Sequence, residues 1–220
     1  MAYTFTATAN SNTTIGYALY GSSSWNKGSS SGACQGAYQG TSASSSRVGV
    51  MVFTNAGGTL RGKIIQGITF SITCSSAGSG SSSKVLTFHQ AALQEISSGT
   101  KGSDMVGATL GTLTGKFYGN TTSHTLNASS NAAFFTALAA YLKAGNSALV
   151  LYNGETSSSS GYSTNYARIT SITITVTYIS AFVWYRNGST WVQCAVYYRL
   201  NGAWILVQPY YRNGSSWIQV

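Results

Sequence analysis

Acidic residues are almost absent from this 220-residue chain, which has 3 Asp plus Glu against 12 Lys plus Arg. The three acids, Glu95, Asp104 and Glu155, stand in separate loop-like stretches. Acid–base catalysis by paired carboxylates needs two acids that converge, so we expect no enzyme of that kind. The formal net charge of +9 comes from this scarcity of acids. Because the cations are spread evenly along the chain and nucleic-acid-binding proteins cluster theirs, we expect no nucleic-acid partner.

Long apolar runs and paired cysteines are also missing. No run of about 18 apolar residues occurs, and the N-terminus lacks a basic and an apolar region, so we expect no membrane span, no signal peptide and synthesis in a cytoplasm. Cys34, Cys74 and Cys194 are odd in number and lack metal-type spacing, which predicts reduced thiols. His89 and His124 have no second ligand nearby in sequence, so we predict no metal and no other cofactor.

Two short motif matches fail on their context. Residues 28–32 match the letters of a nucleophile elbow, but they lie in a Gly/Ser loop with no apolar strand before them. Residues 111–116 resemble a phosphate-binding loop, yet Phe117 stands where a hydroxyl should hold Mg²⁺. We therefore assign no catalytic residue.

The chain is rich in Ser, Thr and Gly, and its β-branched and aromatic residues gather in short segments. These predict strands over residues 3–9, 15–20, 48–54, 63–74, 84–90, 116–118, 148–152 and 167–178. The last is the clearest, because isoleucine and valine alternate there with threonine, as in a strand with one buried face. Loops over 21–32, 41–46, 75–83 and 156–163 should join the strands across the surface.

One helix is predicted over residues 131–143. Phe134, Leu138 and Leu142 fall on one face, Ser129 or Ser130 can cap the start, and Gly145 can end it. We expect this helix to cover an open end or edge of a β-sandwich.

A repeat of 13 residues begins after residue 181. Tyr185, Tyr198 and Tyr211 recur at this interval, and so do the residue triplets Arg186, Arg199 and Arg212 and Trp191, Trp204 and Trp217. Each unit contains Asn-Gly between aromatic and β-branched residues, which predicts a β-hairpin with a type I′ turn. We expect Tyr and Trp to pair across each hairpin.

Hairpins with arms of about five residues cannot bury their aromatic side chains alone, so the repeats should pack on a neighbour. The candidate interface residues are Tyr185, Trp191, Tyr198, Trp204, Tyr211 and Trp217. One interpretation places them between copies of the chain in an oligomer. The other places them, or Trp25 in its Gly/Ser loop, in a glycan-binding face, because sugar rings stack on exposed aromatics.

The Tyr-Arg-Asn-Gly-x-x-Trp and Tyr-Arg-x-Asn-Gly-x-Trp units resemble short aromatic repeats that end minor structural, tail-tip and fibre-like virion proteins of tailed bacteriophages. The segments 148–155 and 166–178 are similar to the closing strands of jelly-roll domains in such proteins and in carbohydrate-binding modules. The resemblance implies a non-enzymatic, multimeric virion component. It carries no catalytic residues.

We therefore predict an all-β chain: a jelly-roll-like antiparallel β-sandwich over 1–180 with one short helix, then a three-hairpin appendage over 181–220. The expected function is that of a bacteriophage structural protein of the tail, baseplate or fibre, assembled in the host cytoplasm. Its partners would be copies of itself and other virion proteins. The alternative is a host-attachment module that binds a cell-wall glycan.

Overall fold

The computed structural model describes residues 2–75, 83–96, 99–115, 123–158, 161–179, 183–194, 196–200, 202–207, 210–213 and 216–219. The helices are α1 (Ala56–Leu60), α2 (Gly102–Met105) and α3 (Ala132–Lys143), with 3-10 turns at Ala43–Ser45 and Ala128–Ser130. The strands are β1 (Tyr3–Ala9), β2 (Ile15–Leu19), β3 (Asn26–Lys27), β4 (Ala33–Gln35), β5 (Arg47–Val52), β6 (Ile64–Cys74), β7 (Lys84–Ala91), β8 (Val106–Gly115), β9 (Ser123–Asn127), β10 (Ala148–Leu151), β11 (Ala167–Ile179), β12 (Val183–Asn187), β13 (Thr190–Cys194), β14 (Val196–Leu200), β15 (Ala203–Val207), β16 (Tyr210–Asn213) and β17 (Ser216–Gln219).

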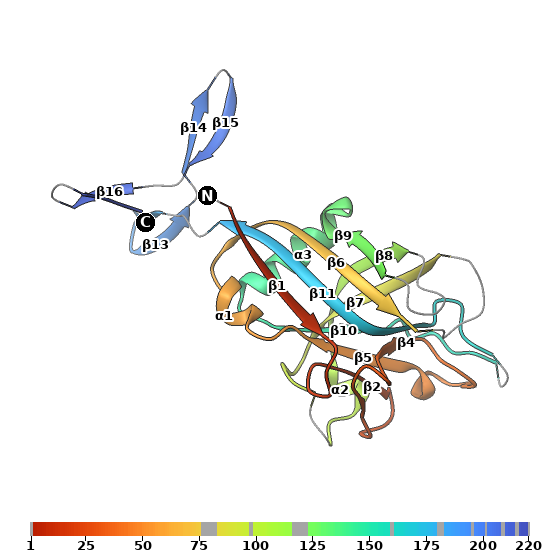
Figure 1. Cartoon of the computed structure of the whole chain (residues 1–220). Helices are drawn as coiled ribbons and strands as arrows, with labels where there is room; N and C mark the ends of the chain where they lie inside the picture. The colour runs from red at the N-terminus through yellow and green to blue at the C-terminus, as the bar shows by residue number, and fades with distance from the viewer. Residues whose placement is uncertain are drawn as a thin grey trace.

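Two antiparallel sheets form the body of the molecule. The first has the order β1-β11-β6-β9, with β4 also paired to β11, and the second has the order β3-β2-β5-β10-β7-β8. Figure 1 shows β1, β11 and β6 lying across β5, β10 and β7. The expected all-β antiparallel sandwich is confirmed.

Strand β11 shows how alternation builds the core between the sheets. Its inward side chains Ile172, Ile174 and Val176 are fully buried. Its outward threonines lie opposite those of β1 in three register pairs, Thr8↔Thr173, Thr6↔Thr175 and Thr4↔Thr177. The outer face is thus built from hydroxyl groups, as the alternation predicted.

Helix α3 covers the core, as expected. Phe134, Leu138 and Leu142 are fully buried and belong to the main hydrophobic cluster. The predicted cap is wrong by one or two residues, because the N-cap is Asn131, whose side-chain oxygen accepts a hydrogen bond from the Phe134 amide. Gly145 has the positive φ of 97° that the predicted helix end requires.

A second, smaller hydrophobic cluster lies on the outer face of the β2–β8 sheet. Strands β5 and β10 are buried on both faces, with Val48, Val50, Ala148 and Val150 forming the outer layer of this cluster. Helix α2 and the aromatic side chains of Tyr20 and Trp25 pack over it.

Sequence patterning does not predict β3, β4, β8 or β9, nor the short helices α1 and α2, so the expectation of a single helix is wrong. Strand β8 contains Gly107, Gly111 and Gly115, and its pairing with β7 shifts register on either side of His89. These features break the two-residue alternation that reveals a strand. The expected strand 116–118 lies outside the described residues.

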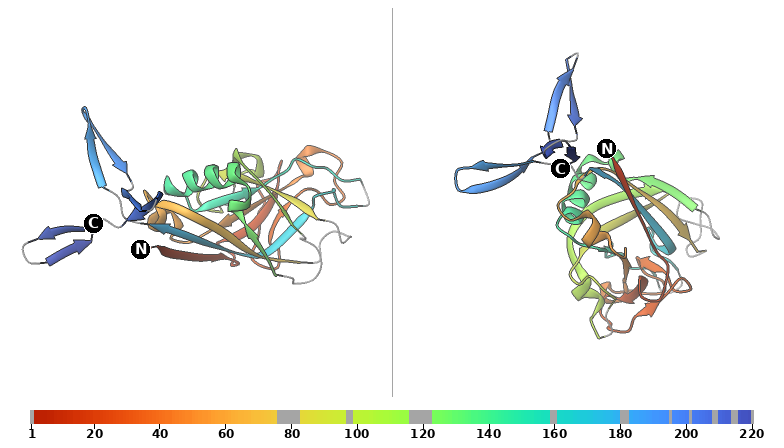
Figure 2. Two further views of the ribbon diagram at one scale, coloured as in Figure 1. Left: turned by 90° about the horizontal axis from the view of Figure 1, so that it is seen from above. Right: turned by 60° about the vertical axis from the view of Figure 1, so that its left-hand side comes forward.

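Three hairpins, β12–β13, β14–β15 and β16–β17, follow β11, and each forms a two-stranded sheet of its own. Figures 1 and 2 show them beyond the end of the sandwich where β1 begins and β11 ends. The domain boundary near residue 180 stays a prediction.

Candidate functional site

The three C-terminal hairpins carry the repeated aromatic residues at equivalent positions. Tyr185, Tyr198 and Tyr211 lie on the first strand of each hairpin, and Trp191, Trp204 and Trp217 on the second. Gly188 and Gly202, at the turns of the first two hairpins, have φ values of 62° and 84°. In the second hairpin Leu200 pairs with Ala203, so the Asn-Gly dipeptide lies between the strands as predicted. In the first and third hairpins Asn187 pairs with Thr190 and Asn213 with Ser216, so the asparagine belongs to the strand and the predicted Asn-Gly turn is wrong there.

The hairpin register corrects one expectation. The residue opposite each repeat tryptophan is arginine, in the pairs Arg186↔Trp191, Arg199↔Trp204 and Arg212↔Trp217. The residue opposite each repeat tyrosine is aliphatic, in the pairs Tyr185↔Val192, Tyr198↔Ile205 and Tyr211↔Ile218. The predicted direct Tyr–Trp pairing is therefore wrong, and the unit that repeats is an Arg–Trp pair beside a Tyr–aliphatic pair.

Trp25 is half-buried just before β3. Its ring packs against the outer cluster on β5 and β10, and its indole N–H donates a hydrogen bond of 2.9 Å to the Thr100 carbonyl oxygen. The hydrogen bond joins the loop that contains Trp25 to the loop that contains Thr100, over the outer face of the sheet. A glycan contact at Trp25 stays a prediction.

A second aromatic surface, which was not predicted from the sequence, lies at the end of the sandwich away from the three hairpins. Tyr38 and Tyr162 are each 40% exposed, and their rings stack with centroids 4.4 Å apart. Tyr38 follows β4, whereas Tyr162 lies in the loop before β11, so β11 runs from this surface to the hairpins (Figure 1). The two ends are about 40 Å apart, from 13 residues of β11 at the usual strand rise.

Tyr38 and Tyr162 are held together by their backbones, which form an isolated antiparallel bridge. The bonds that join the two segments are Gln39 N to Gly161 O (2.9 Å), Ser163 N to Ala37 O (2.9 Å), Ala37 N to Ser163 Oγ (2.9 Å), Ser157 N to Gly40 O (2.9 Å) and Gly40 N to Ser157 Oγ (3.2 Å). The first two flank Tyr38 and Tyr162, which makes them a non-hydrogen-bonded pair. Side chains approach most closely in such pairs, and the two rings are therefore pressed together.

Behind this pair, aromatic rings and one cation continue inward as a tyrosine column, which consists of Tyr38, Tyr162, Tyr166, Arg47 and Tyr17. Tyr166 is 1% exposed, and its ring centroid is 4.7 Å from that of Tyr162. The Arg47 guanidinium lies 5.1 Å from the Tyr166 ring and 4.8 Å from the Tyr17 ring. Cation–π contacts of this kind stabilise a partly desolvated arginine.

The inner part of the column is chemically quiet. Arg47 donates a hydrogen bond to the Tyr166 hydroxyl. Burial raises the pKa of Tyr166 and of the adjacent Cys34 thiol, so both groups stay protonated at neutral pH, although Arg47 opposes the shift. A buried neutral thiol is a poor nucleophile. We assign this inner part a positioning role.

The loop that carries Tyr162 is fastened to the sandwich by a buried glutamine. Gln35 is fully buried, and its side-chain nitrogen donates to the carbonyl oxygens of Val85 (2.7 Å) and Asn165 (2.8 Å). Its side-chain oxygen accepts from the Thr87 amide at 3.0 Å. The Gln35 side-chain amide thus pairs with the backbone of β7 as a neighbouring strand would, beyond the point where β10 ends.

Glu155 completes the fastening of the same loop. Its carboxylate accepts from the backbone amide of Asn165 at 2.7 Å and from the side-chain nitrogen of Asn165 at 2.6 Å. The Lys84 ammonium donates to the Thr164 carbonyl oxygen at 2.6 Å. One of the three acids of the chain therefore holds a loop in place.

Asp104 and His89 also form hydrogen bonds within the fold, whereas Glu95 lies on the surface. Asp104 accepts a hydrogen bond from Ser103, and Glu95 is exposed. The ring nitrogens of His89 lie 3.0 Å from the carbonyl oxygens of Gly107 and Tyr152, so His89 links β8 to the segment after β10. Among the described residues, no group of three or more His, Cys, Asp and Glu side chains could hold a metal ion.

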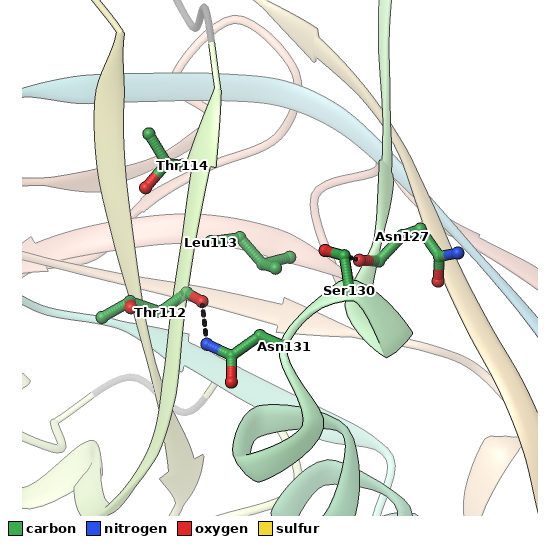
Figure 3. Close-up of a pocket in the computed structure, with 6 residues that line it drawn as sticks. All are labelled: Thr112, Leu113, Thr114, Asn127, Ser130 and Asn131. Atoms are coloured by element: carbon green, nitrogen blue, oxygen red, sulfur yellow. Dashed lines mark hydrogen bonds between the residues drawn. The ribbon is translucent and has the colours of Figure 1, made fainter.

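A shallow pocket of about 260 Å³ lies between β8 and the start of α3 (Figure 3). It is lined by Thr112, Leu113, Thr114, Asn127, Ser130 and Asn131. The Asn131 side chain caps the helix and donates to the Thr112 carbonyl oxygen at 3.3 Å. Its lining is neutral, so it offers no acid or base for catalysis.

Neither a known family model nor any curated protein matches this sequence. In the part of the chain that is described, no helix is both long and apolar enough to cross a membrane.

Tyr38, Gln39 and Tyr162 could have been noticed in the sequence by the reasoning applied to Trp25. They stand in the polar stretches Gly-Ala-Tyr-Gln-Gly and Gly-Tyr-Ser, where an aromatic residue has little local hydrophobic surface to cover. Their stacking depends on pairing across more than 120 residues, which no local pattern reveals.

Proposed function

We propose that this protein is a non-enzymatic structural subunit of a bacteriophage particle, in the tail, baseplate or fibre, that assembles through its three C-terminal hairpins. The observation that carries the proposal is the threefold recurrence of one register, with arginine opposite tryptophan each time. An isolated two-stranded hairpin is marginally stable in water. Three hairpins outside the two sheets therefore favour a partner surface, and copies of the chain supply one.

The strand order adds support at the level of the fold. With β3, β4 and β5 set aside, the sheets read β1-β11-β6-β9 and β2-β10-β7-β8. We interpret this as a jelly-roll order into which β5 is inserted between β2 and β10. Its successive strands alternate between the two sheets except at the β7–β8 hairpin, which lies within one sheet. Jelly rolls are frequent in viral and sugar-binding proteins, although a fold does not determine a function.

Light scattering tests the assembly role. We expect the full chain to form a defined oligomer, and a variant with Trp191, Trp204 and Trp217 all changed to Ala to fall to the monomer mass while its circular dichroism still reports a folded sandwich. Tyr38→Ala, which removes an exposed aromatic at the opposite end, is the matched control and should keep the oligomer. A monomeric full chain, or a triple variant that stays oligomeric, would contradict the proposal.

A second candidate function, recognition of a surface glycan, is favoured by a separate observation. The exposed Tyr38–Tyr162 pair lies at the end of β11 away from the hairpins, so assembly through the hairpins would leave it accessible.

A further inference from the structure

We infer that Tyr38 and Gln39 form a sugar-binding site, in which the outer face of the Tyr38 ring stacks on a neutral pyranose and the Gln39 amide binds its hydroxyl groups. This rests on the second candidate function and is independent of assembly through the hairpins. Four features of the described residues carry it.

The first feature is a rigid, exposed aromatic face. Tyr162 lies between Tyr38 and Tyr166, with ring centroids 4.4 Å and 4.7 Å away. Tyr38 is the outermost ring of the tyrosine column and contacts only Tyr162 among the rings of the described residues. Because Tyr38 is 40% exposed, part of its ring is open to a ligand. Because the backbone bridge and the column behind it fix the ring, binding would order little that is not already ordered.

The second feature is the backbone of Gln39. Its φ of 52° lies in the left-handed region, and this backbone conformation is unfavourable for glutamine, which has a Cβ atom. Asn55 is the other non-glycine residue with positive φ among those described, and asparagine tolerates this conformation more readily. Glycine would remove the strain at position 39. A glutamine there, whose side chain is exposed and whose side-chain amide has no hydrogen-bond partner among the described residues, indicates that the side chain is used.

The third feature is the lack of a free cation in the two loops around Tyr38, which selects the ligand class. The nearby cations are engaged inside the fold, Arg47 on the Tyr166 and Tyr17 rings and Lys84 on the Thr164 carbonyl oxygen. Residues 36–46 and 152–166 contain no Lys or Arg, and the one acid, Glu155, is occupied by Asn165. A nucleic acid would stack on tyrosine too, but it also needs cations for its phosphates. A neutral sugar needs an aromatic face and uncharged hydrogen-bonding groups, which these Ser-rich loops provide.

The fourth feature separates a sugar from a protein partner. Tyr38 and Tyr162 are the only large hydrophobic side chains that are exposed among the described residues of these two loops. Protein hot spots lie inside a larger surface that packs tightly and excludes water. Two isolated rings surrounded by serine, glycine and threonine lack such a surface.

The test begins with the full chain on a printed array of neutral and anionic oligosaccharides, followed by titration of the strongest-bound oligosaccharide into four variants. Tyr38→Ala should raise Kd about tenfold, because it removes the stacking surface, whereas Tyr38→Phe should stay within about threefold. Tyr197→Ala removes a 52% exposed tyrosine from β14 and is the matched control, with Kd unchanged.

Gln39→Gly separates binding from folding. It should raise Kd about fivefold by removing the amide, while leaving Tm unchanged or higher because glycine relieves the positive φ. A Kd unchanged in Gln39→Gly, or equal losses in Tyr38→Ala and Tyr197→Ala, would overturn the site while leaving glycan recognition standing. If no oligosaccharide binds, or only a protein does, both the site and the second candidate function fail, and the oligomer test is unaffected.

Discussion

Replacing the buried Gln35 should destabilise the sandwich strongly, because its side chain makes three hydrogen bonds to backbone groups. Gln35→Met conserves volume but leaves the carbonyl oxygens of Val85 and Asn165 and the Thr87 amide without their partner. Each unsatisfied group costs about 1–3 kcal/mol. Because these groups are partly buried, we take the low end and expect a loss of about 3 kcal/mol, a large fraction of the roughly 5–15 kcal/mol of a typical domain.

Urea unfolding of the full chain, followed by circular dichroism, measures this loss. Gln66→Met, on an exposed position of β6, is the matched control and should change stability by no more than about 0.5 kcal/mol. Thermal unfolding should show a fall of about 10 °C for Gln35→Met against almost none for the control. A loss below about 1 kcal/mol for Gln35→Met, or one equal to that of Gln66→Met, would refute the reasoning that the Gln35 amide replaces a strand neighbour of β7.

Three further predictions concern packing, capping and ionisation. A Cβ added at Gly49 would lie 2.6 Å from the backbone nitrogen of Cys34, so Gly49→Ala should cost at least about 2 kcal/mol, whereas Gly58→Ala, with no atom within 4 Å, should be neutral or stabilising in thermal unfolding. Asn131→Ala should cost about 1 kcal/mol through loss of the α3 cap, and Asn131→Asp should restore most of it; equal stabilities would contradict the cap. Burial raises the pKa of Cys74 from 9.0 to about 12, so its stabilising contribution is complete below pH 9 and is lost as the pH rises toward 12. Cys74→Ala should flatten the stability curve in that range, and an unchanged slope would count against this cause.

Much of the sandwich could be predicted because its strands carry local patterns. Strand β1 was predicted with its observed bounds, and the bounds of β6 and β11 differ from the predicted ones by a single residue. Each has a regular alternation of buried and outward residues. Strand β4 escaped because it has only three residues and its partners are distant in sequence, namely β11 and the β7 backbone that the Gln35 side chain binds.

The candidate site could be predicted less well than the fold. The Asn-Gly dipeptides indicated where the hairpins turn, because they have a local conformational preference, although only the second hairpin turns on the dipeptide itself. The opposition of arginine to tryptophan follows from the register, which the second repeat obscures by shifting its Asn-Gly one residue along the chain. The tyrosine column depends on the pairing of Ser157, Tyr162 and Ser163 with the segment after β4, and only the three-dimensional structure brings these together.

Three departures from local rules lie at one end of the sandwich. Gln35 is a fully buried amide, Gln39 has the backbone conformation of glycine, and the Nε atom of Arg47 is buried without a hydrogen-bond partner among the described residues. All three lie within one short stretch of sequence, and all three support or adjoin Tyr38 and Tyr162. If stability alone determined these residues, glycine would serve better at position 39. Exceptions of this kind are expected at functional sites, where a fixed geometry matters more than the local free energy. Their convergence beneath an exposed aromatic pair is a reason, independent of any resemblance, to look for a ligand at this end first.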